Sequence, residues 1–573
     1  MPRDASPTLN DEARPILTGG THSHDQSYGS DTSSFVAEGD IGIGESLIPS
    51  AVPELSFARA SAIISSFAIL VFLQASNFSV ITTTQGVIAA DLGVFEGTSW
   101  FTSAYLVSLS SIAPLNGKLS HIFAPKHCIF CSSLIMGVGA IITGLAPSFS
   151  WFIFGRVVTG IGSAGIYTIA IVLAIQLTPP KRRGLFQGLL NSGYTFGVAM
   201  GAVAAGALEG RFGWRVMFWL QAPIATIAAI CLLLSVPDTE PAHSADESED
   251  ELDVVARLSR LDYAGASLLV VTIVLLLYSV STPHISWIPL CISLLLFLPL
   301  FILQEAYRAL DPIVPIDVLC SRAVLLTCLA TLGFMMSRWS VLFFTPIYAI
   351  AVRGWSPATA GSILVPTNAG FALGGIVSGA VHIRRAGSFY ASCLVVMAFF
   401  PATLIILAAN SVADSGAVLV VLIVFCNGLC AGATLNYTLS HVLHLAPHNV
   451  RFIVTSLMAT FRGFAGTFGS AIGGGIFERA LRGSLERGFA EEGLKNRTEL
   501  IRRLVATPGL TQQLQGLEKE VAVGAYVDAL QSLFWSAAAL GVIVLFAQAG
   551  TGWTGPQEEK VSLDEGGDVD FED

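Results

Sequence analysis

Charged residues are scarce in this chain. Asp, Glu, Lys and Arg together make up 12% of its 573 residues, whereas 53% are hydrophobic. An average soluble domain carries roughly 25% charged residues, so the composition excludes that class and predicts a polytopic membrane protein. Much of the net charge of −11 falls in the two ends of the chain and in the acidic run 246–253. No basic cluster predicts nucleic-acid binding.

Patterns for metal, nucleotide and catalytic sites are also missing. The nine cysteines lie almost all in apolar stretches, and the single CxxC at 128–131 lacks the second pair that a zinc site needs. There is no GxxxxGK[ST] loop for ATP, and no nucleophile–base pair falls at membrane depth. His441, His444 and His448 end one apolar stretch, where they are expected to face solvent or lipid headgroups. We therefore predict neither an enzyme nor a cofactor or metal site.

The apolar stretches contain no clearly embedded carboxylate, yet three arginines lie well inside them, away from the ends: Arg156, Arg338 and Arg462. An arginine at the centre of a bilayer costs at least about 2.5 kcal/mol. Arg156 is followed by Gly160 and Gly162, which weaken helix propensity and indicate the close approach of a neighbouring helix. The face that carries Arg156 is predicted to line a polar cavity inside a membrane protein.

Fourteen apolar stretches are long enough to cross a bilayer as helices. Lys and Arg concentrate in the loops that a cytosolic N-terminus places on the cytosolic side, so both termini are predicted to be cytosolic. Glycine-rich segments recur in the fifth and thirteenth stretches, and internal repeats are typical of secondary transporters. The stretches are 60–88, 98–116, 128–147, 151–175, 185–208, 215–236, 263–281, 286–305, 323–349, 357–380, 388–409, 415–436, 450–476 and 528–549.

The predicted fold class is an all-α membrane protein with two six-helix halves and two additional central helices. The corresponding parts are a disordered cytosolic tail 1–58, an N-terminal half 59–236, an acidic cytosolic loop 237–262, an inserted helix pair 263–305, a C-terminal half 306–550 with a long outer loop 477–527, and an acidic cytosolic tail 551–573.

Two short motifs bear on location and modification. The N-terminal tail has no secretory signal, and within it Glu12, Ile16 and Leu17 form an acidic dileucine pattern that would direct the protein to a vacuole or lysosome. Such hexapeptides are also frequent by chance, so the plasma membrane and the vacuolar membrane both stay open. The sequon at Asn496, in the predicted outer loop, is an expected glycosylation site.

Three motifs in the first half carry a resemblance to a known family. The loop 116–126, the arginine motif 156–162 and the glycine-rich helix 197–206 are similar to motifs of the major facilitator superfamily. Over about residues 60–550, the chain resembles the fourteen-span drug–proton antiporter branch of that family, as found in fungi. The motif residues expected to act in the conformational change are Gly117, Lys118, Lys126, Gly160, Gly162, Gly197, Gly201 and Gly206.

The resemblance implies a major facilitator fold and a proton-coupled exporter that functions as a monomer, but the chain departs from the family in four places. His121 stands where the loop motif usually has an acid, and Pro125 where it has a basic residue. Ala202 replaces the usual proline of the fifth span. Asn77 stands near the centre of the first span, where the branch usually has an aspartate. Since an amide cannot titrate, the resemblance leaves Arg156 without a proton partner.

Polar residues within the spans are the candidates for a substrate and proton pathway. Embedded amides also hold helices together, each contributing roughly 0.6–2 kcal/mol, and this interpretation competes for every amide. Three arginines without embedded carboxylates suit a neutral, zwitterionic or carboxylate-bearing molecule better than a dication or a basic amino acid. The candidates are Asn77, Gln85, Arg156, Gln187, Asn191, Arg338, Asn368, Asn436 and Arg462.

The leading functional hypothesis is a secondary active transporter, namely a proton-coupled efflux pump for a small organic molecule such as a secondary metabolite, toxin or drug. An amino-acid transporter of the vacuolar membrane is the first alternative; the dileucine pattern favours it and Asn77 weakens it. A ligand-sensing receptor that does not transport is an alternative of another class. Such receptors usually carry a long signalling tail, whereas the tail 551–573 is short.

Overall fold

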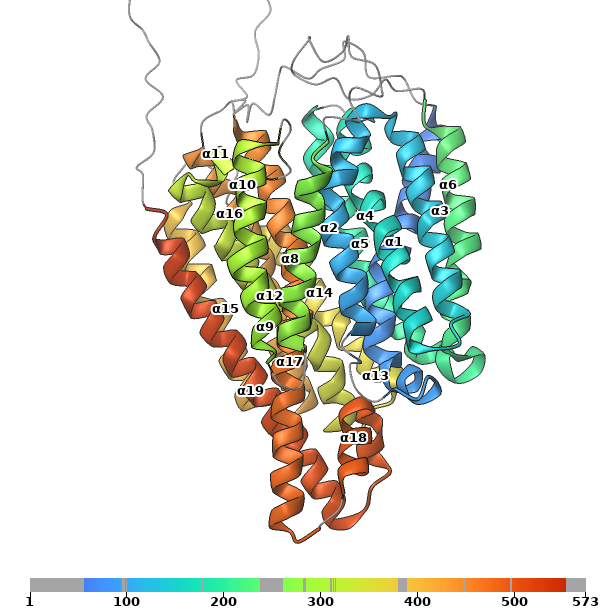
Figure 1. Ribbon diagram of the computed structural model, residues 1–573, viewed down its shortest axis with the longest axis vertical. Coiled ribbons are helices and arrows are strands. Elements are labelled where there is room, and N and C mark those ends of the chain that lie inside the picture. The colour runs from blue at the N-terminus through green and yellow to red at the C-terminus, as the bar shows by residue number, and fades with distance from the viewer. Residues whose placement is uncertain are drawn as a thin grey trace, which may run out of the picture. The chain divides into compact units, whose positions relative to one another are not determined.

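The computed structural model describes residues 56–94, 98, 100–177, 180–237, 261–281, 285–309, 312, 314, 316–379, 389–446, 450–494 and 497–552. The regular structure of these residues is helical, as predicted (Figure 1). The dileucine residues Glu12, Ile16 and Leu17, the sequon residue Asn496, and nearly all of the two tails and the acidic loop 237–262 lie outside the described residues.

Six helices form what we call the N-terminal group, 57–235. α1 packs against α5 and α6, and α4 packs against α2 and α3. Glycine permits close contacts between these helices: a Cβ on Gly201 of α5 would lie 2.6 Å from Cβ of Ser76 on α1. The helices are α1 (Phe57–Asp91), α2 (Trp100–Ile122), α3 (Pro125–Gly144), α4 (Phe149–Leu177), α5 (Pro180–Trp219) and α6 (Gln221–Ser235).

The C-terminal group, 322–549, contains the longest described helix, α17. α12 packs against α17 and α19, α14 against α16, and α15 against both α16 and α19. The elements are α12 (Arg322–Ala351), α13 (Pro357–Ser362), α14 (Leu364–Val377), α15 (Tyr390–Ala409), α16 (Ala417–Leu445), α17 (Arg451–Glu491), α18 (Thr498–Ala506), the 3₁₀ helix η5 (Pro508–Gln512) and α19 (Gly516–Ala549).

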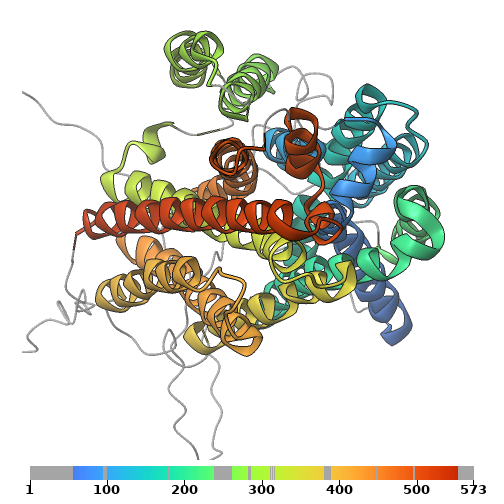
Figure 2. The ribbon, with the colours of Figure 1, turned by 90° about the horizontal axis from the view of Figure 1, so that it is seen from below.

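A smaller set of helices lies between the two groups in the sequence. α8 packs against the broken helix formed by α9, η2 and α10, and its other contacts are with α2 and α17. Figure 2 shows this green pair at the periphery, with the blue helices of the N-terminal group to one side. The elements are α8 (Tyr263–Ser281), α9 (Trp287–Ile292), the π-helix η2 (Ser293–Phe297), α10 (Leu298–Tyr307) and α11 (Ile316–Leu319).

The two groups meet along a few helix pairs. α2 contacts α17, α1 contacts α12, and α5 contacts both α13 and α14. At the α5–α13 crossing, a Cβ on Gly206 would lie 2.6 Å from the backbone nitrogen of Ala358, and one on Gly361 would lie 2.7 Å from the carbonyl oxygen of Ala202. The glycines of α5 therefore serve contacts within the N-terminal group and contacts between the groups.

The length and hydropathy of the helices support a multi-pass membrane protein. Ten described helices are long and apolar enough to cross a membrane, or up to eleven if the bent pair α5–α6 is counted as one span. α2 and α17 are not among them, although both pack inside the bundle. Each predicted stretch overlaps a described helix, and the count of fourteen spans stays a prediction.

The stretch 477–527 was expected to be a long outer loop, but most of it is helical. α17 continues without a break to Glu491, α18 and η5 follow, and α19 begins at Gly516. The physical reason is that the Arg, Glu, Ala and Leu residues after 477 end the apolar run and are still good helix formers. We call the end of the bundle where α17 and α19 meet α18 the α18 end (Figure 1).

His441 was expected to face solvent or lipid headgroups, and this is wrong because it is buried. One of its ring nitrogens lies 3.0 Å from Oγ1 of Thr551, two residues after the end of α19. The Tyr390 hydroxyl donates to the carbonyl of Ala549 at 2.7 Å, and its ring lies beside the imidazole. The end of α19 thus covers the last turns of α16, a contact that no sequence period indicates. His444 is half-buried, and His448 lies outside the described residues.

Candidate functional site

Arg156 on α4 is fully buried, and all its recorded hydrogen bonds go to neutral groups. Its Nε donates to the carbonyl of Phe101 at 2.9 Å, its Nη1 to Oδ1 of Asn77 at 3.0 Å, and its Nη2 to the carbonyl of Asn77 at 3.1 Å. The guanidinium carbon lies 4.5 Å from the centre of the Tyr105 ring. Among the described residues, no carboxylate pairs with this charge.

Asn77 on α1 joins Arg156 to α6. Its Nδ2 donates to Oε1 of Gln221 at 2.6 Å, and Nε2 of Gln221 donates to the carbonyl of Met217 at 2.8 Å. Arg156 therefore has a partner on the first span, and that partner is the uncharged amide of Asn77. Since amides and carbonyls do not titrate near neutral pH, this network holds a fixed positive charge.

Substitution of Asn77 tests whether it holds Arg156 in place. Asn77→Leu removes the acceptor of Nη1, and hydrogen bonds to charged groups contribute about 1.5–3 kcal/mol. We expect the purified variant to lose stability of that order, seen as a lower thermal unfolding midpoint. Asn77→Asp keeps an acceptor facing the guanidinium and is the control, expected to retain most of the stability. Wild-type stability of Asn77→Leu would contradict the assignment.

Arg338 on α12 is the second buried cation, with 4% of its surface exposed. Its Nη2 donates to Oδ1 of Asn368 on α14 at 3.1 Å, and its guanidinium carbon lies 4.3 Å from the centre of the Phe371 ring. Neither Nη1 of Arg338 nor Nδ2 of Asn368 has a hydrogen-bond partner among the described residues. Each member of this hydrogen-bonded pair thus keeps one buried donor unused.

Arg462 on α17 lies where the two helix groups meet. Its charge acts on Arg338 within the C-terminal group, and on Tyr167 of α4 and Tyr194 of α5 in the N-terminal group. The two tyrosine rings contact each other, with centroids 5.7 Å apart. No hydrogen bond or ion pair of Arg462 is recorded with another described residue. The positive charges of Arg338 and Arg462, both in the C-terminal group, therefore act on each other. Arg462 also faces helices of the N-terminal group.

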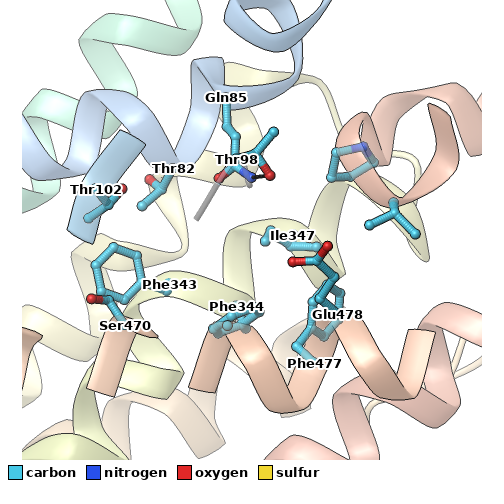
Figure 3. A pocket seen from close by; sticks show the side chains of 13 residues that line it. Thr82, Gln85, Thr98, Thr102, Phe343, Phe344, Ile347, Ser470, Phe477 and Glu478 are labelled. Atoms are coloured by element: carbon cyan, nitrogen blue, oxygen red, sulfur yellow. Dashed lines mark hydrogen bonds between the residues drawn. The ribbon is translucent and has the colours of Figure 1, made fainter. Parts of the chain in front are cut away.

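A cavity of about 60 Å³ lies between the groups nearer the α18 end. Figure 3 shows Gln85 and Thr98 on one side of it, and Phe344 and Glu478 on the other. Gln85 donates from Nε2 to Oγ1 of Thr98 at 2.9 Å. Pro508 of η5 also lines the cavity, so the segment after α18 closes it from that end.

Glu478 is a candidate that sequence reasoning missed. It has 9% of its surface exposed, and its carboxylate points toward the cavity (Figure 3). The pattern places it in a charged run after the thirteenth apolar stretch, which is why it was assigned to a loop. One feature of the sequence could have indicated it: Glu478 directly follows Phe477 at the end of a glycine-rich apolar run. If the helix continues past that run, the side chain of Glu478 can face the bundle.

The remaining amide candidates do not join the residues above, as far as the structure describes their side chains. Nδ2 of Asn436 donates to the carbonyl of Gly375 at 2.6 Å, so Asn436 joins α16 to α14 in the way that structural amides do. Gln187 and Asn191 lie on α5, but their side chains are outside the described set. The candidates that come together are Asn77 with Arg156, and Arg338 with Asn368 and Arg462.

The glycines of the family motifs lie at helix contacts. A Cβ on Gly160 would lie 2.5 Å from the carbonyl oxygen of Tyr105 on α2, and Gly162 faces Met136 of α3. Gly197 faces Ala75 of α1, and Gly117 lies near Thr168 of α4. Lys126 lies in the first turn of α3, and the side chain of Lys118 is outside the described set.

Comparison with known proteins gives a family model and several relatives. The model of the Major Facilitator Superfamily matches residues 67–470. The vacuolar membrane amino acid uptake transporter fnx2 of Schizosaccharomyces pombe is 26% identical over 54% of this chain and 54% of its own length, so the match spans about half of that relative. The vacuolar basic amino acid transporter 2 of Saccharomyces cerevisiae is 26% identical over 78% of this chain and 97% of its own.

Other relatives carry names of a different kind. The efflux pump FUS6 of Gibberella fujikuroi is 24% identical over 75% of this chain and 77% of its own. Among solved structures, a bacterial homologue of the human lysosomal transporter Spinster, inward-facing and unoccupied, superposes with a TM-score of 0.61 at 15% identity, over 87% of this chain and 99% of that one. Because the family model covers well over half of the 573 residues, the chain belongs to the Major Facilitator Superfamily.

Proposed function

We propose that the protein is a secondary active transporter that exports a small organic molecule from the cytosol in exchange for protons. The observation that carries this proposal is the buried pair of Arg338 and Asn368 in the C-terminal group, together with Arg462, whose charge acts on Arg338 and on Tyr167 and Tyr194 of the N-terminal group. A polar site at the interface of two repeats is the usual location for substrate in secondary transporters. Relatives named as efflux pumps and multidrug resistance proteins favour export.

The two helix groups are proposed to be the halves that rock against each other. The positive-inside asymmetry of the loops supports an outer location for the α18 end. At that end, α5 packs tightly on α13, and the segment around Thr507 contacts Gly86 of α1. Access from that end would require these contacts to separate, so the described state is closed at the α18 end, which is the outer side in this proposal.

Glu478 is the proposed proton carrier. Proton-coupled exchange needs a group whose charge changes, and a carboxylate inside a membrane transporter is the common choice. The Arg156 network supplies no such group, because its partners are amides and carbonyls. Among the described residues that line the cavity, Glu478 is the only carboxylic acid.

An amino-acid transporter of the vacuolar membrane is the second candidate. It is favoured by two relatives named for vacuolar amino-acid transport and by the motif at Glu12, Ile16 and Leu17. Microscopy of a tagged protein, with and without Ile16 and Leu17 changed to Ala, decides between the vacuolar and the plasma membrane. A vacuolar signal that survives these changes would remove the motif from the proposal.

A flux measurement tests the transport proposal directly. The purified full-length protein is placed in liposomes with an imposed pH gradient. The probes are an anionic, a neutral and a cationic fluorescent organic dye, together with labelled lysine and glutamine. We expect at least one probe to move against the proton flow, and a protonophore to stop it. If neither direction of the gradient drives flux of any probe, the proposal of a proton-coupled transporter fails.

A further inference from the structure

The site where the helix groups meet carries an uncompensated positive charge. Arg338 is buried, Arg462 lies near enough to repel it, and no carboxylate among the described residues pairs with either. Buried charges are normally paired, because an unpaired one loses its hydration without any compensation. Two cations that repel each other are stabilised most by an anion between or beside them. The protein itself places none there among its described residues.

The hydrogen bond between Arg338 and Asn368 determines which donors of this pair are unused. A guanidinium only donates hydrogen bonds, so Asn368 must turn its Oδ1 toward Arg338, as observed at 3.1 Å. The amide nitrogen is bonded to the same carbon, and it is therefore held next to the guanidinium with its own donors unused. Nη1 of Arg338 is also unused. Two free donors on one hydrogen-bonded pair can serve the two oxygens of a carboxylate.

Aromatic residues lie close to these charges. Phe371 lies against the guanidinium of Arg338, and Tyr167 and Tyr194 lie near Arg462 from the opposite helix group. Trp339, the residue after Arg338, packs on Gly466 one turn beyond Arg462. These rings offer apolar surface to the body of a ligand, since binding sites combine apolar walls with a few fixed polar groups.

We propose that Arg338, Asn368 and Arg462 form the binding site for an organic carboxylate with an aromatic or otherwise apolar body. The carboxylate accepts from Nη1 of Arg338 and Nδ2 of Asn368, and Arg462 supplies the second positive charge. The inference deepens the proposed function, on which it rests, by naming the chemical class of the substrate. A cation, including a basic amino acid with its second positive group, meets two arginines here and no acid among the described residues.

Equilibrium binding tests the site without any transport. The probes are 1-naphthoate, the uncharged 1-naphthamide and the cationic 1-naphthylmethylamine, which share one ring system and differ in charge. Quenching of the intrinsic tryptophan fluorescence of the purified full-length protein reports binding, since Trp339 follows Arg338. We expect naphthoate to bind at least about tenfold more tightly than the amide, and the amine to bind most weakly. Equal affinity for the three probes would overturn the inference.

Matched variants assign the effect to these residues. Arg338→Gln and Arg462→Gln are each expected to remove the preference for naphthoate over naphthamide. Arg487→Gln makes the same change on α17, at an exposed residue near the α18 end, and is expected to leave the preference unchanged. Asn368→Asp is nearly isosteric and places a carboxylate beside Arg338. It is expected to keep the fold, as judged by size-exclusion elution, and to lose naphthoate binding.

The outcomes separate this inference from the transport proposal. Naphthoate binding that depends on Arg338, in a protein through which no gradient drives flux, supports the site and overturns the transport proposal. Gradient-driven flux of a neutral or cationic probe that Arg338→Gln leaves unchanged supports transport and overturns the site. A folded Asn368→Asp variant that binds naphthoate as the wild type does also overturns the site.

Discussion

Glu478→Gln is expected to reduce proton-driven transport to the level of protein-free liposomes while leaving substrate exchange intact. Gln has nearly the same shape as Glu but cannot take up and release a proton. Glu478 is buried and lines the cavity between the helix groups, whereas the partners of Arg156 are neutral. If Glu478 carries the coupled proton, then only the steps that bind or release that proton should be lost.

Two assays in liposomes distinguish this role. The first measures accumulation of a transported probe under a pH gradient, and the second measures exchange of labelled for unlabelled probe without a gradient. Glu486→Gln is the control, because it makes the same change on an exposed residue of the same helix. It is expected to behave as the wild type in both assays. Equal loss of both activities in Glu478→Gln would assign Glu478 to substrate binding or to the fold.

The architecture was largely predictable because hydrophobic run length determines it. Stretches of about 20 apolar residues have few stable arrangements other than membrane helices, and each predicted stretch overlaps a described helix. The family followed from short motifs such as the one at Arg156 and Gly160, whose glycines lie at helix contacts. These features are local in sequence, so a single chain displays them.

The pairings within the site were not predictable, because they join residues far apart in the sequence. Asn77 and Arg156 were both candidates, and the resemblance places an amide where a carboxylate is usual, but nothing in the sequence shows that the two side chains form a hydrogen bond. Arg338 and Asn368 meet only because α12 and α14 pack in one group. Glu478 was missed for a different reason: hydropathy marks where an apolar run ends, and helix α17 continues beyond that point.

A disulfide between positions 86 and 507 is expected to abolish transport, and a reductant is expected to restore it. Gly86 lies in the last part of α1, and a Cβ built on it would be 3.7 Å from Cβ of Thr507. Disulfides require Cβ atoms roughly 3.5–4.5 Å apart, so Gly86→Cys combined with Thr507→Cys should cross-link readily. The described state, closed at the α18 end, would then be locked.

The cross-link joins the two helix groups because the segment around Thr507 is anchored to the C-terminal group. Oγ1 of Thr511 donates to the carbonyl of Ala351 on α12 at 2.9 Å, and the hydroxyl of Tyr526 on α19 donates to the carbonyl of Leu504 at 2.5 Å. Opening at this end must therefore either carry the segment away from α1 or tear it from α12 and α19.

The two single-cysteine variants are the controls for the native thiols, and both should transport with and without oxidant. If the oxidised double variant, shown to be cross-linked by its electrophoretic mobility, transports at the wild-type rate, then α1 and the segment around Thr507 do not separate during transport. In that case the protein would open elsewhere, and the contacts of α18 and η5 would be a fixed part of the fold. Reversible loss of flux would instead identify this contact as one that the transport cycle must break.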